Sequence, residues 1–291
     1  MSVILPAVLP VFITALIGYG LARANRPFDN RTITFLVASI GTPALVFFNL
    51  ANTTVAPGAL ATIAAATAVA ITFYLVAGTI ALRGLGLKWQ TFLPSLAFPN
   101  AGNLGLPLAL YAAGQEGLNY AIVIFAITSI LNLTAGQAIA AGKNNWLTVM
   151  RSPILPAVAL GLLFAYGGIP IPLWATNTLE MLSGLTIPLM LLMLGTSLAK
   201  IQVTTFGRSA ILSVVRIGMG TIAGFTLAAL FGFTGPERIA FVLQCAMPVA
   251  VFNYVFAQMY DNEPGEVASL VVVSTLLSVL TTPIVLAMLA P

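Results

Sequence analysis

Charged side chains are scarce in this chain, where only 6% of the 291 residues are Asp, Glu, Lys or Arg. A soluble domain of this length needs far more charge to cover its surface. Hydrophobic residues make up 59% of the sequence, and the mean hydropathy is +1.05. We therefore predict an all-α polytopic membrane protein. The net charge of +4 gives no reason to expect a nucleic-acid partner, because nearly all the basic residues lie between apolar runs, as in cytoplasmic loops.

Several chemistries lack the residues that they need. No histidine is present and Cys245 is the single cysteine, so we expect no metal site, imidazole proton relay or intrachain disulfide. No glycine-rich loop with a phosphate-binding lysine occurs, so we expect no ATP binding. We also expect no cofactor and no enzymatic activity. No Asp or Glu lies near the centre of an apolar run, which disfavours a carboxylate proton relay. A coupling ion, H⁺ or Na⁺, would have to use backbone carbonyls and amide oxygens.

Ten apolar runs approach the ~20 residues that a helix needs to cross a bilayer core of ~30 Å. They cover residues 3–22, 32–50, 59–82, 90–113, 117–141, 153–168, 179–198, 209–232, 238–260 and 267–289. Four of the intervening segments hold most basic residues, namely Arg23, Arg26, Arg31, Arg83, Lys88, Lys143, Arg151, Lys200 and Arg208. The positive-inside rule places these segments in the cytoplasm. We therefore expect a multi-pass protein of the cell (inner) membrane with both termini outside.

The two halves of the chain share a pattern at a constant offset. The sequence ILPAV occupies residues 4–8 and again 154–158, and Asn103 corresponds to Asn253 at the same offset of 150. Five spans per half give the halves opposite orientations in the membrane. We therefore predict two inverted five-helix repeats, residues 1–142 and 143–291. Inverted repeats of this kind are typical of secondary transporters, which bind substrate where helices of both halves are broken.

The fourth and ninth spans contain helix breakers at equivalent positions. The stretch from Pro99 to Pro107 holds two prolines, two glycines and two asparagines, and Pro248 lies in the ninth span. A proline inside a helix costs ~3 kcal/mol and a glycine up to ~1 kcal/mol, which predicts broken helices. Backbone groups freed in hydrocarbon need protein or a water-filled cavity, so the breaks are candidate sites. The candidate substrate-binding residues around the crossover prolines Pro99 and Pro248 are Asn100, Gly102, Asn103, Gln244 and Asn253.

Four further polar residues are candidates for the transport pathway or an ion site. Asn49 ends the second span, Gln137 lies in the fifth and Gln258 follows Pro248 in the ninth. Arg216 is the one basic residue clearly inside a span, ~10 Å from its cytoplasmic end at 1.5 Å per residue. Its side chain could either reach the interface by snorkelling or bind substrate charge. Each of the other three could instead satisfy a helix end or a neighbouring helix.

Two short motifs resemble the auxin efflux carrier family of bacterial and plant transporters. They are Gly-Leu-Pro-Leu at 105–108, and Met247-Pro248 followed by Asn-Tyr-Val-Phe-Ala at 253–257. The resemblance implies ten spans, with broken helices 4 and 9 crossing each other. It implies a scaffold of helices 1, 2, 6 and 7, a mobile transport domain of helices 3, 4, 5, 8, 9 and 10, an elevator-like motion and a homodimer. It also implies an organic anion as substrate. Plant members carry a polar residue directly after the second crossover proline, where this chain has Val249.

The sequence thus predicts a secondary transporter of a small carboxylate, such as malate, malonate or an auxin-like acid, that works by alternating access. One alternative is a sodium-coupled symporter of larger organic anions, similar to bile acid symporters, which use acidic side chains that this chain lacks near the breaks. An alternative of another class is a channel or a membrane sensor. A sensor usually carries a soluble output domain, and no segment between the apolar runs is long enough for one.

Overall fold

The computed structural model describes residues 4–142 and 153–289, and every regular element in these ranges is helical. The predicted all-α fold is therefore confirmed. The predicted repeat boundary, Lys143 and Arg151 fall in residues 143–152, outside the described ranges. The elements in chain order are α1 (Ile4–Arg23), α2 (Asn30–Leu36), η1 (Val37–Gly41), α3 (Thr42–Ala51), α4 (Pro57–Gly84), α5 (Trp89–Ala97), η2 (Ala101–Gly105), α6 (Leu106–Leu131), η3 (Asn132–Gly136), α7 (Gln137–Ala141), α9 (Ile154–Gly167), α10 (Leu173–Lys200), α11 (Phe206–Leu230), α12 (Gly235–Cys245), α13 (Val251–Met259) and α14 (Pro264–Leu289).

Seven helical stretches among the described residues are long and apolar enough to cross a membrane. One of them, Ala101–Ala141, has 41 residues, which is about 60 Å at 1.5 Å per residue and so about twice a bilayer core. Gly114 divides this stretch, because its φ of 66° and ψ of −162° are not helical and belong to a region that is open almost only to glycine. The kink therefore separates the predicted spans 90–113 and 117–141.

The remaining predicted spans correspond to shorter helices. The helix α9 has 14 residues, while α5, α12 and α13 are halves of helices broken at the predicted prolines. The predicted seventh span begins six residues late, because α10 already starts at Leu173. The inverted relation of the two halves stays a prediction.

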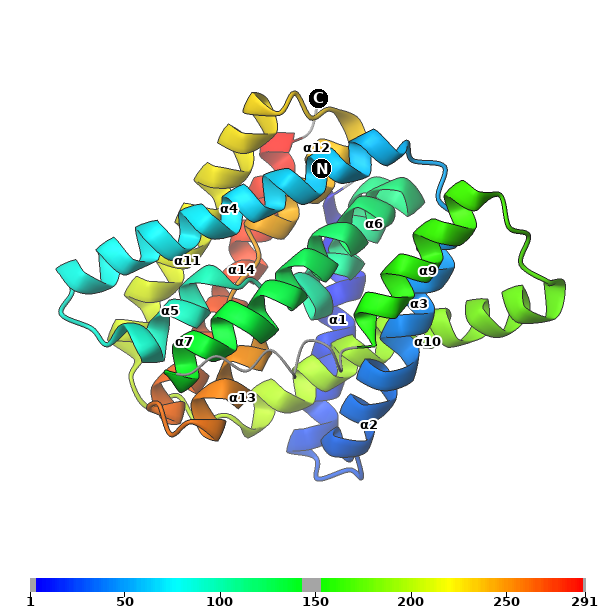
Figure 1. Ribbon diagram of the computed structural model, residues 1–291. Coiled ribbons are helices and arrows are strands. Elements are labelled where there is room, and N and C mark those ends of the chain that lie inside the picture. The colour runs from blue at the N-terminus through cyan, green and yellow to red at the C-terminus, as the bar shows by residue number, and fades with distance from the viewer. Residues whose placement is uncertain (1–3, 143–152, 290–291) are drawn as a thin grey trace.

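Close helix contacts unite α1, α3, α9 and α10 into one group (Figure 1). Gly195 of α10 lies so near α1 that an added Cβ would overlap the carbonyl oxygen of Ala15. Gly161 of α9 likewise faces α3, where an added Cβ would lie 2.9 Å from Leu50 Cβ. Small residues let helix backbones approach closely inside a membrane. We call α1, α2, α3, α9 and α10 the first helix group; α2 packs on α10.

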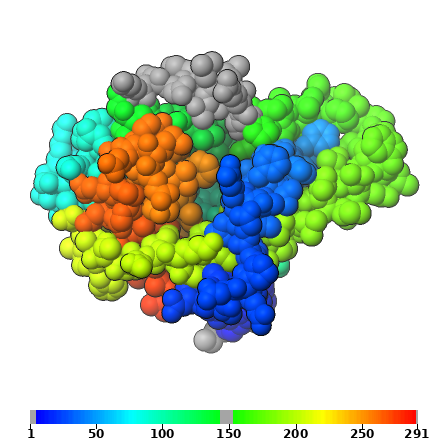
Figure 2. Space-filling view, turned by 90° about the horizontal axis from the view of Figure 1, so that it is seen from below, coloured from blue at the N-terminus to red at the C-terminus, as the bar shows by residue number. Residues whose placement is uncertain are grey.

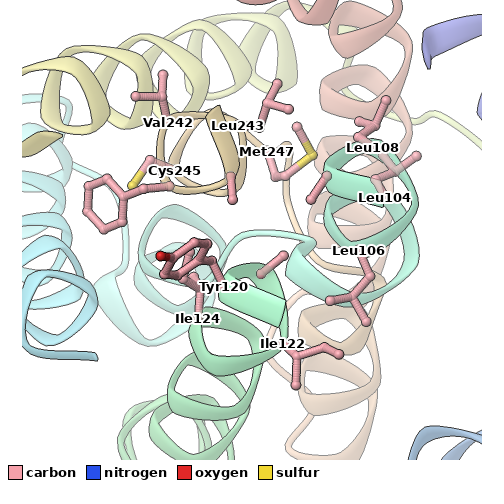
Figure 3. Packing of buried hydrophobic residues seen from close by; sticks show 14 of the residues in the cluster. Leu104, Leu106, Leu108, Tyr120, Ile122, Ile124, Val242, Leu243, Cys245 and Met247 are labelled. Atoms are coloured by element: carbon pink, nitrogen blue, oxygen red, sulfur yellow. The ribbon is translucent and has the colours of Figure 1, made fainter. Parts of the chain in front are cut away.

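The other helices, α4 to α7 and α11 to α14, form a second helix group, and one continuous buried core joins it to the first group. Its largest interface joins α12 to α6, and α11 packs on both α12 and α14. Figure 3 shows this core, where Leu243 and Met247 of the α12 segment lie beside Leu104, Leu106 and neighbouring side chains. Contacts between the two groups run from α1 to α6 and α14, from α10 to η2, and from α3 and α9 to α6. The candidate site residues at both helix breaks belong to the second group.

The N-terminal half of α10 projects from the rest of the molecule (Figure 2, light green). It presents Leu173, Trp174 and Met181 with about three-quarters of each side chain exposed. Apolar side chains also cover the outer faces of α1, α4 and α11. Lipid chains provide the apolar surroundings that such faces need, and this agrees with a multi-pass membrane protein.

Candidate functional site

Both predicted helix breaks are present. The helix α5 ends at Ala97, and Phe98 and Asn100 have non-helical backbone angles before η2 begins. In the second break α12 ends at Cys245, and α13 begins only at Val251. The prolines act as expected, since each lacks an N–H for the helix ladder and crowds the preceding turn.

The two breaks hydrogen-bond directly to each other. The backbone N–H of Asn100 donates to the carbonyl oxygen of Pro248 at 2.8 Å, and that of Ala250 donates to Phe98 at 3.4 Å. Pro99 and Val249 face each other as an isolated antiparallel bridge. Backbone groups that the prolines free from one helix are therefore satisfied by the other, as hydrocarbon surroundings require.

Side chains complete this pairing from neighbouring helices. The amide nitrogen of Asn253 donates to the Phe98 carbonyl at 3.2 Å. The backbone N–H of Val249 donates to the Ser274 hydroxyl of α14 at 3.2 Å. Ser274 is a contributor that sequence reasoning missed, because a serine within an apolar helix carries no sign of its distant partner. Val249 is fully buried and contributes its backbone to the site, so the departure from the plant pattern leaves this pairing intact.

Three predicted substrate-binding residues keep unpaired amide atoms in the interior. Within the described ranges, Asn100 Nδ2, Asn253 Oδ1 and both amide atoms of Gln244 are buried without a hydrogen-bond partner. The Gln244 amide packs against η2, where an added Cβ on Gly105 would lie 2.6 Å from Gln244 Cδ. Buried polar atoms in proteins almost always have partners, so these amide atoms have the capacity to bind a polar ligand.

Gly102 and Asn103 lie on the accessible side of the same break. Both are partly exposed, whereas their neighbours Ala101 and Leu104 are buried. The side-chain oxygen of Asn100 accepts from the backbone N–H of Asn103 at 3.2 Å and caps η2. The ring of Phe125 lies against Gly102, 2.9 Å from the position of an added Cβ. The Asn103 side chain is therefore partly accessible, and the absence of a Cβ at Gly102 leaves room for the Phe125 ring.

We call the two hydrogen-bonded helix breaks, residues 98–100 and 246–250, the crossing. Arg216 of α11 contacts the ends of the helices that lead into it. Its guanidinium donates to the carbonyl oxygens of Leu96 at 2.8 Å, Cys245 at 2.9 Å and Met247 at 3.3 Å. The side chain is fully buried, so, of the two alternatives for Arg216, the structure excludes snorkelling to the membrane interface. The three carbonyl oxygens satisfy the guanidinium inside the protein, so the side chain does not need to extend to water.

The comparisons with known proteins agree with this architecture. A family model described as membrane transport protein matches residues 3–150 and 137–286. The chain belongs to this membrane transport family. It is the auxin efflux carrier family that the motifs resemble, and its members are transport proteins rather than enzymes. Membership and the apolar helices together establish a multi-pass membrane transport protein.

Two relatives are archaeal proteins described as uncharacterized transporters. The one from Methanocaldococcus jannaschii is 29% identical over 62% of each chain, so the match spans less than two-thirds of its length. The one from Methanothermobacter thermautotrophicus is 26% identical over 95% of each chain. These descriptions support transport and leave the substrate to be proposed.

The remaining candidates of this transporter lie away from the paired breaks. Asn49 of α3 donates to its own helix at Leu45 and accepts from Gln115 Nε2 at the start of the segment after the Gly114 kink. One turn on, Asn119 Nδ2 donates to the Thr53 hydroxyl at 3.1 Å. The first pair connects the first helix group with the second, the second pair connects the loop after α3 with α6, and the sequence analysis identified only Asn49 among the four residues.

Gln137 and Gln258 have separate surroundings. Gln137 is buried and donates to the Tyr260 hydroxyl at 2.7 Å, while its Oε1 has no partner among the described residues. Gln258 is exposed on α13 and donates to the Tyr254 hydroxyl at 2.6 Å. The structure therefore brings together Asn100, Asn253 and Gln244 near the breaks, and it places Asn49, Gln137 and Gln258 elsewhere.

Proposed function

We propose that this protein is a secondary transporter of a small organic carboxylate, such as malate, malonate or an auxin-like acid, and that it works by alternating access. The observation that carries the proposal is the reciprocal bonding of the two breaks around Pro99 and Pro248. It satisfies the backbone and leaves amide atoms of Asn100, Gln244 and Asn253 free beside it. Secondary transporters with broken helices bind substrate at such positions.

The chemistry of the crossing suits an anion. The helix α13 begins after Ala250 without a side-chain cap. The N–H groups of Val251 and Phe252 therefore remain available, whereas that of Asn253 donates to the Ala250 carbonyl. A helix N-terminus carries a partial charge of about +0.5. The free Asn100 Nδ2 and the partly exposed Asn103 amide supply further neutral donors. Neutral donors can bind a carboxylate in an apolar interior without a second buried charge.

The division into two helix groups supports an elevator-like motion. We propose that the first helix group is the scaffold and that the second carries the substrate past it. Tight glycine contacts lie within the first group, as at Gly195 and Gly161. Polar pairs, by contrast, lie between the groups. Side-chain pairs can exchange partners during a sliding motion, whereas interlocked backbones resist it.

The family resemblance and the basic loops support three further parts of this proposal. The protein resides in the cell membrane, both termini lie on the outer side, and two copies form a homodimer. The described loop around Arg26 and the ion pairs at Lys88 and Arg208 would then face the cytoplasm.

The test begins with purified protein and a panel of mono- and dicarboxylates. A carboxylate that binds only the folded protein raises its melting temperature, and the best ligand then serves in uptake assays with proteoliposomes. We expect saturable uptake that unlabelled substrate inhibits. Conductance that never saturates would instead establish a channel, and no thermal shift with any carboxylate would remove the anion assignment.

A further inference from the structure

Arg216 is a buried cation without an acidic partner. Its side chain has no exposed surface, and the two ion pairs among the described residues, Lys88–Glu263 and Arg208–Glu266, lie elsewhere. Removing a charge from water without compensation is strongly unfavourable. The surroundings of Arg216 must therefore supply negative potential by other means.

Backbone carbonyls supply that potential. Leu96 lies in the last turn of α5, Cys245 is the last residue of α12, and Met247 lies in the second break. Carbonyls in the last turn of a helix lack partners within the helix and carry the negative end of its dipole. Arg216 donates to one such carbonyl in each half-helix and to a third in the break. The ring of Tyr74 lies 4.5 Å from the guanidinium carbon and adds a cation–π contact.

The fixed shape of the guanidinium matches this arrangement. Nη1 points to α5, while Nη2 and Nε point to the end of α12 and the following break. A planar fork can serve several fixed acceptors at once, which a compact ammonium group does less well. One side chain therefore joins the carboxyl ends of both broken helices.

Glycines on α11 let that helix approach the crossing. An added Cβ on Gly220, one turn after Arg216, would overlap the carbonyl oxygen of Cys245. An added Cβ on Gly224 would lie 3.0 Å from Cys245 Cβ and 3.2 Å from Val242 Cα. The helix is thus packed against the end of α12, and Arg216 reaches the carbonyls from a firmly placed backbone.

In transporters with broken helices, the carboxyl ends of half-helices and the unwound carbonyls coordinate the coupling cation. We propose that the guanidinium of Arg216 occupies the place of such a coupling cation, as a cation tethered to the protein. No free monovalent cation then binds to the carbonyls of Leu96, Cys245 and Met247 during transport. Arginine stays charged at every physiological pH and cannot be deprotonated there, so the same group does not carry a proton. Arg216 acts as a positioning residue that holds the two half-helices together without touching substrate.

The stability of the purified protein tests this placement without reference to the proposed substrate. The variant is Arg216→Met, which keeps a long apolar side chain and removes the charge. The matched control is Arg208→Met on the same helix, where the arginine is partly exposed and pairs with Glu266. Melting temperatures are compared in choline, sodium, potassium and guanidinium chloride at equal and low ionic strength.

We expect the wild type to melt at the same temperature in sodium, potassium and choline. Arg216→Met should melt about 5–15 °C lower, because the carbonyls lose their partner. Guanidinium, or a metal cation small enough for the vacated place, should restore part of that loss. Arg208→Met should show neither the large fall nor the rescue. A fall without any rescue by cations would indicate a merely structural arginine and would overturn the proposal.

Two further results would overturn the proposal. One is a sodium- or potassium-specific rise in the melting temperature of the wild type, since it would reveal a free cation site. The other is a stable Arg216→Met that no cation affects. If Arg216→Met does not fold, Arg216→Lys takes its place. Its melting temperature should lie between that of the wild type and that expected for Arg216→Met. A melting temperature equal to that of the wild type would contradict the need for the planar guanidinium.

The inference about coupling rests on the proposed function and has its own measurement. Uptake of the carboxylate should keep its rate when choline replaces sodium on both sides of the membrane. A protein that passes the stability test but takes up no carboxylate would disprove the proposed substrate and leave the tethered cation in place.

Discussion

The backbone nitrogen of Asn100 and the carbonyl oxygen of Pro248 are 2.8 Å apart, although the two residues lie 148 positions apart in the chain. Each residue lies where its helix is interrupted, so the bond joins two groups that an intact helix would have satisfied internally. The pairing explains how two broken helices can lie inside an apolar core. Among the described residues it leaves both amide atoms of Gln244 and the Oδ1 atom of Asn253 without a hydrogen-bond partner.

Replacing Asn103 should remove substrate binding and leave the fold intact. Asn103→Ala keeps the backbone N–H that Asn100 caps and deletes only the partly exposed amide. A lost hydrogen bond to a charged group typically costs ~1.5–3 kcal/mol, so uptake of the carboxylate should fall at least about tenfold. Uptake into proteoliposomes and the melting temperature measure the two effects. Asn52→Ala, at an exposed amide bonded to its own helix, should change neither, and undiminished uptake by Asn103→Ala would disprove its place in the site.

Adding a methyl group at Gly105 should destabilise the crossing. An alanine Cβ there would lie 2.6 Å from Gln244 Cδ, and Gln244 is fully buried. Overpacking of this kind costs about 1–3 kcal/mol, which should lower the melting temperature by several degrees. Adding Gln244→Ala to Gly105→Ala makes room and should recover part of the loss. Gly218→Ala on α11 has open space around the new methyl and should be neutral or slightly stabilising.

A cross-link between the helix groups should stop transport. Thr53, in the loop that follows α3 of the first group, and Asn119 of the second group are in side-chain contact, so cysteines at both positions should form a disulfide under oxidation. We expect oxidation to abolish uptake and reduction to restore it, because the link prevents sliding of one group past the other. Cysteines at Thr34 and Met193, which touch within the first group, provide the matched control. Full uptake with the Thr53–Asn119 link closed would exclude an elevator-like motion across this contact.

The cap of α2 should give a pH-dependent contribution to stability. Asp29 accepts from the Thr32 hydroxyl and from the backbone N–H groups of Arg31 and Thr32, and these bonds lower the pKa of its carboxyl below the usual 3.8. A depressed pKa means that the contribution is complete above pH 3.8 and is lost as the pH falls through the folded-state value. Asp29→Ala should therefore melt about 2–4 °C below the wild type at neutral pH.

Melting temperatures of the wild type and Asp29→Ala at acid pH test the direction of this pH dependence. The difference between wild type and Asp29→Ala should shrink below pH 3.8, whereas Asp29→Asn, which keeps an uncharged acceptor, should show little dependence on pH. A gap that widens on acidification would contradict the assigned role of the carboxylate.

The positions of helices and breaks could be read from local sequence because the causes are local. Hydrocarbon surroundings require helices, so runs such as 59–82 become α4 with edges shifted by only two residues at each end. Pro99 and Pro248 interrupt their helices through their own rings. The predicted start of α10 at residue 179 is late, because polar residues after Trp174 lower the hydropathy of the first turns of this helix.

Side-chain partners could not be read in this way, because they depend on which faces of distant helices meet. Gln258 was a candidate because it follows Pro248, but the turn of α13 directs it outward to Tyr254. Gln115 and Asn119 were missed because nothing in their own segment indicates the α3 residues that they contact.

By itself, the sequence determined the membrane class, the helical content and the places where helices break, since each follows from composition and from residues within one turn. Only the tertiary structure decided that the breaks bond to each other and that Arg216 lies fully buried between Leu96, Cys245 and Met247. Burial of a charge depends on acceptors brought from remote segments. The position of the arginine can be read from the sequence, but only the fold brings the three carbonyl acceptors to it.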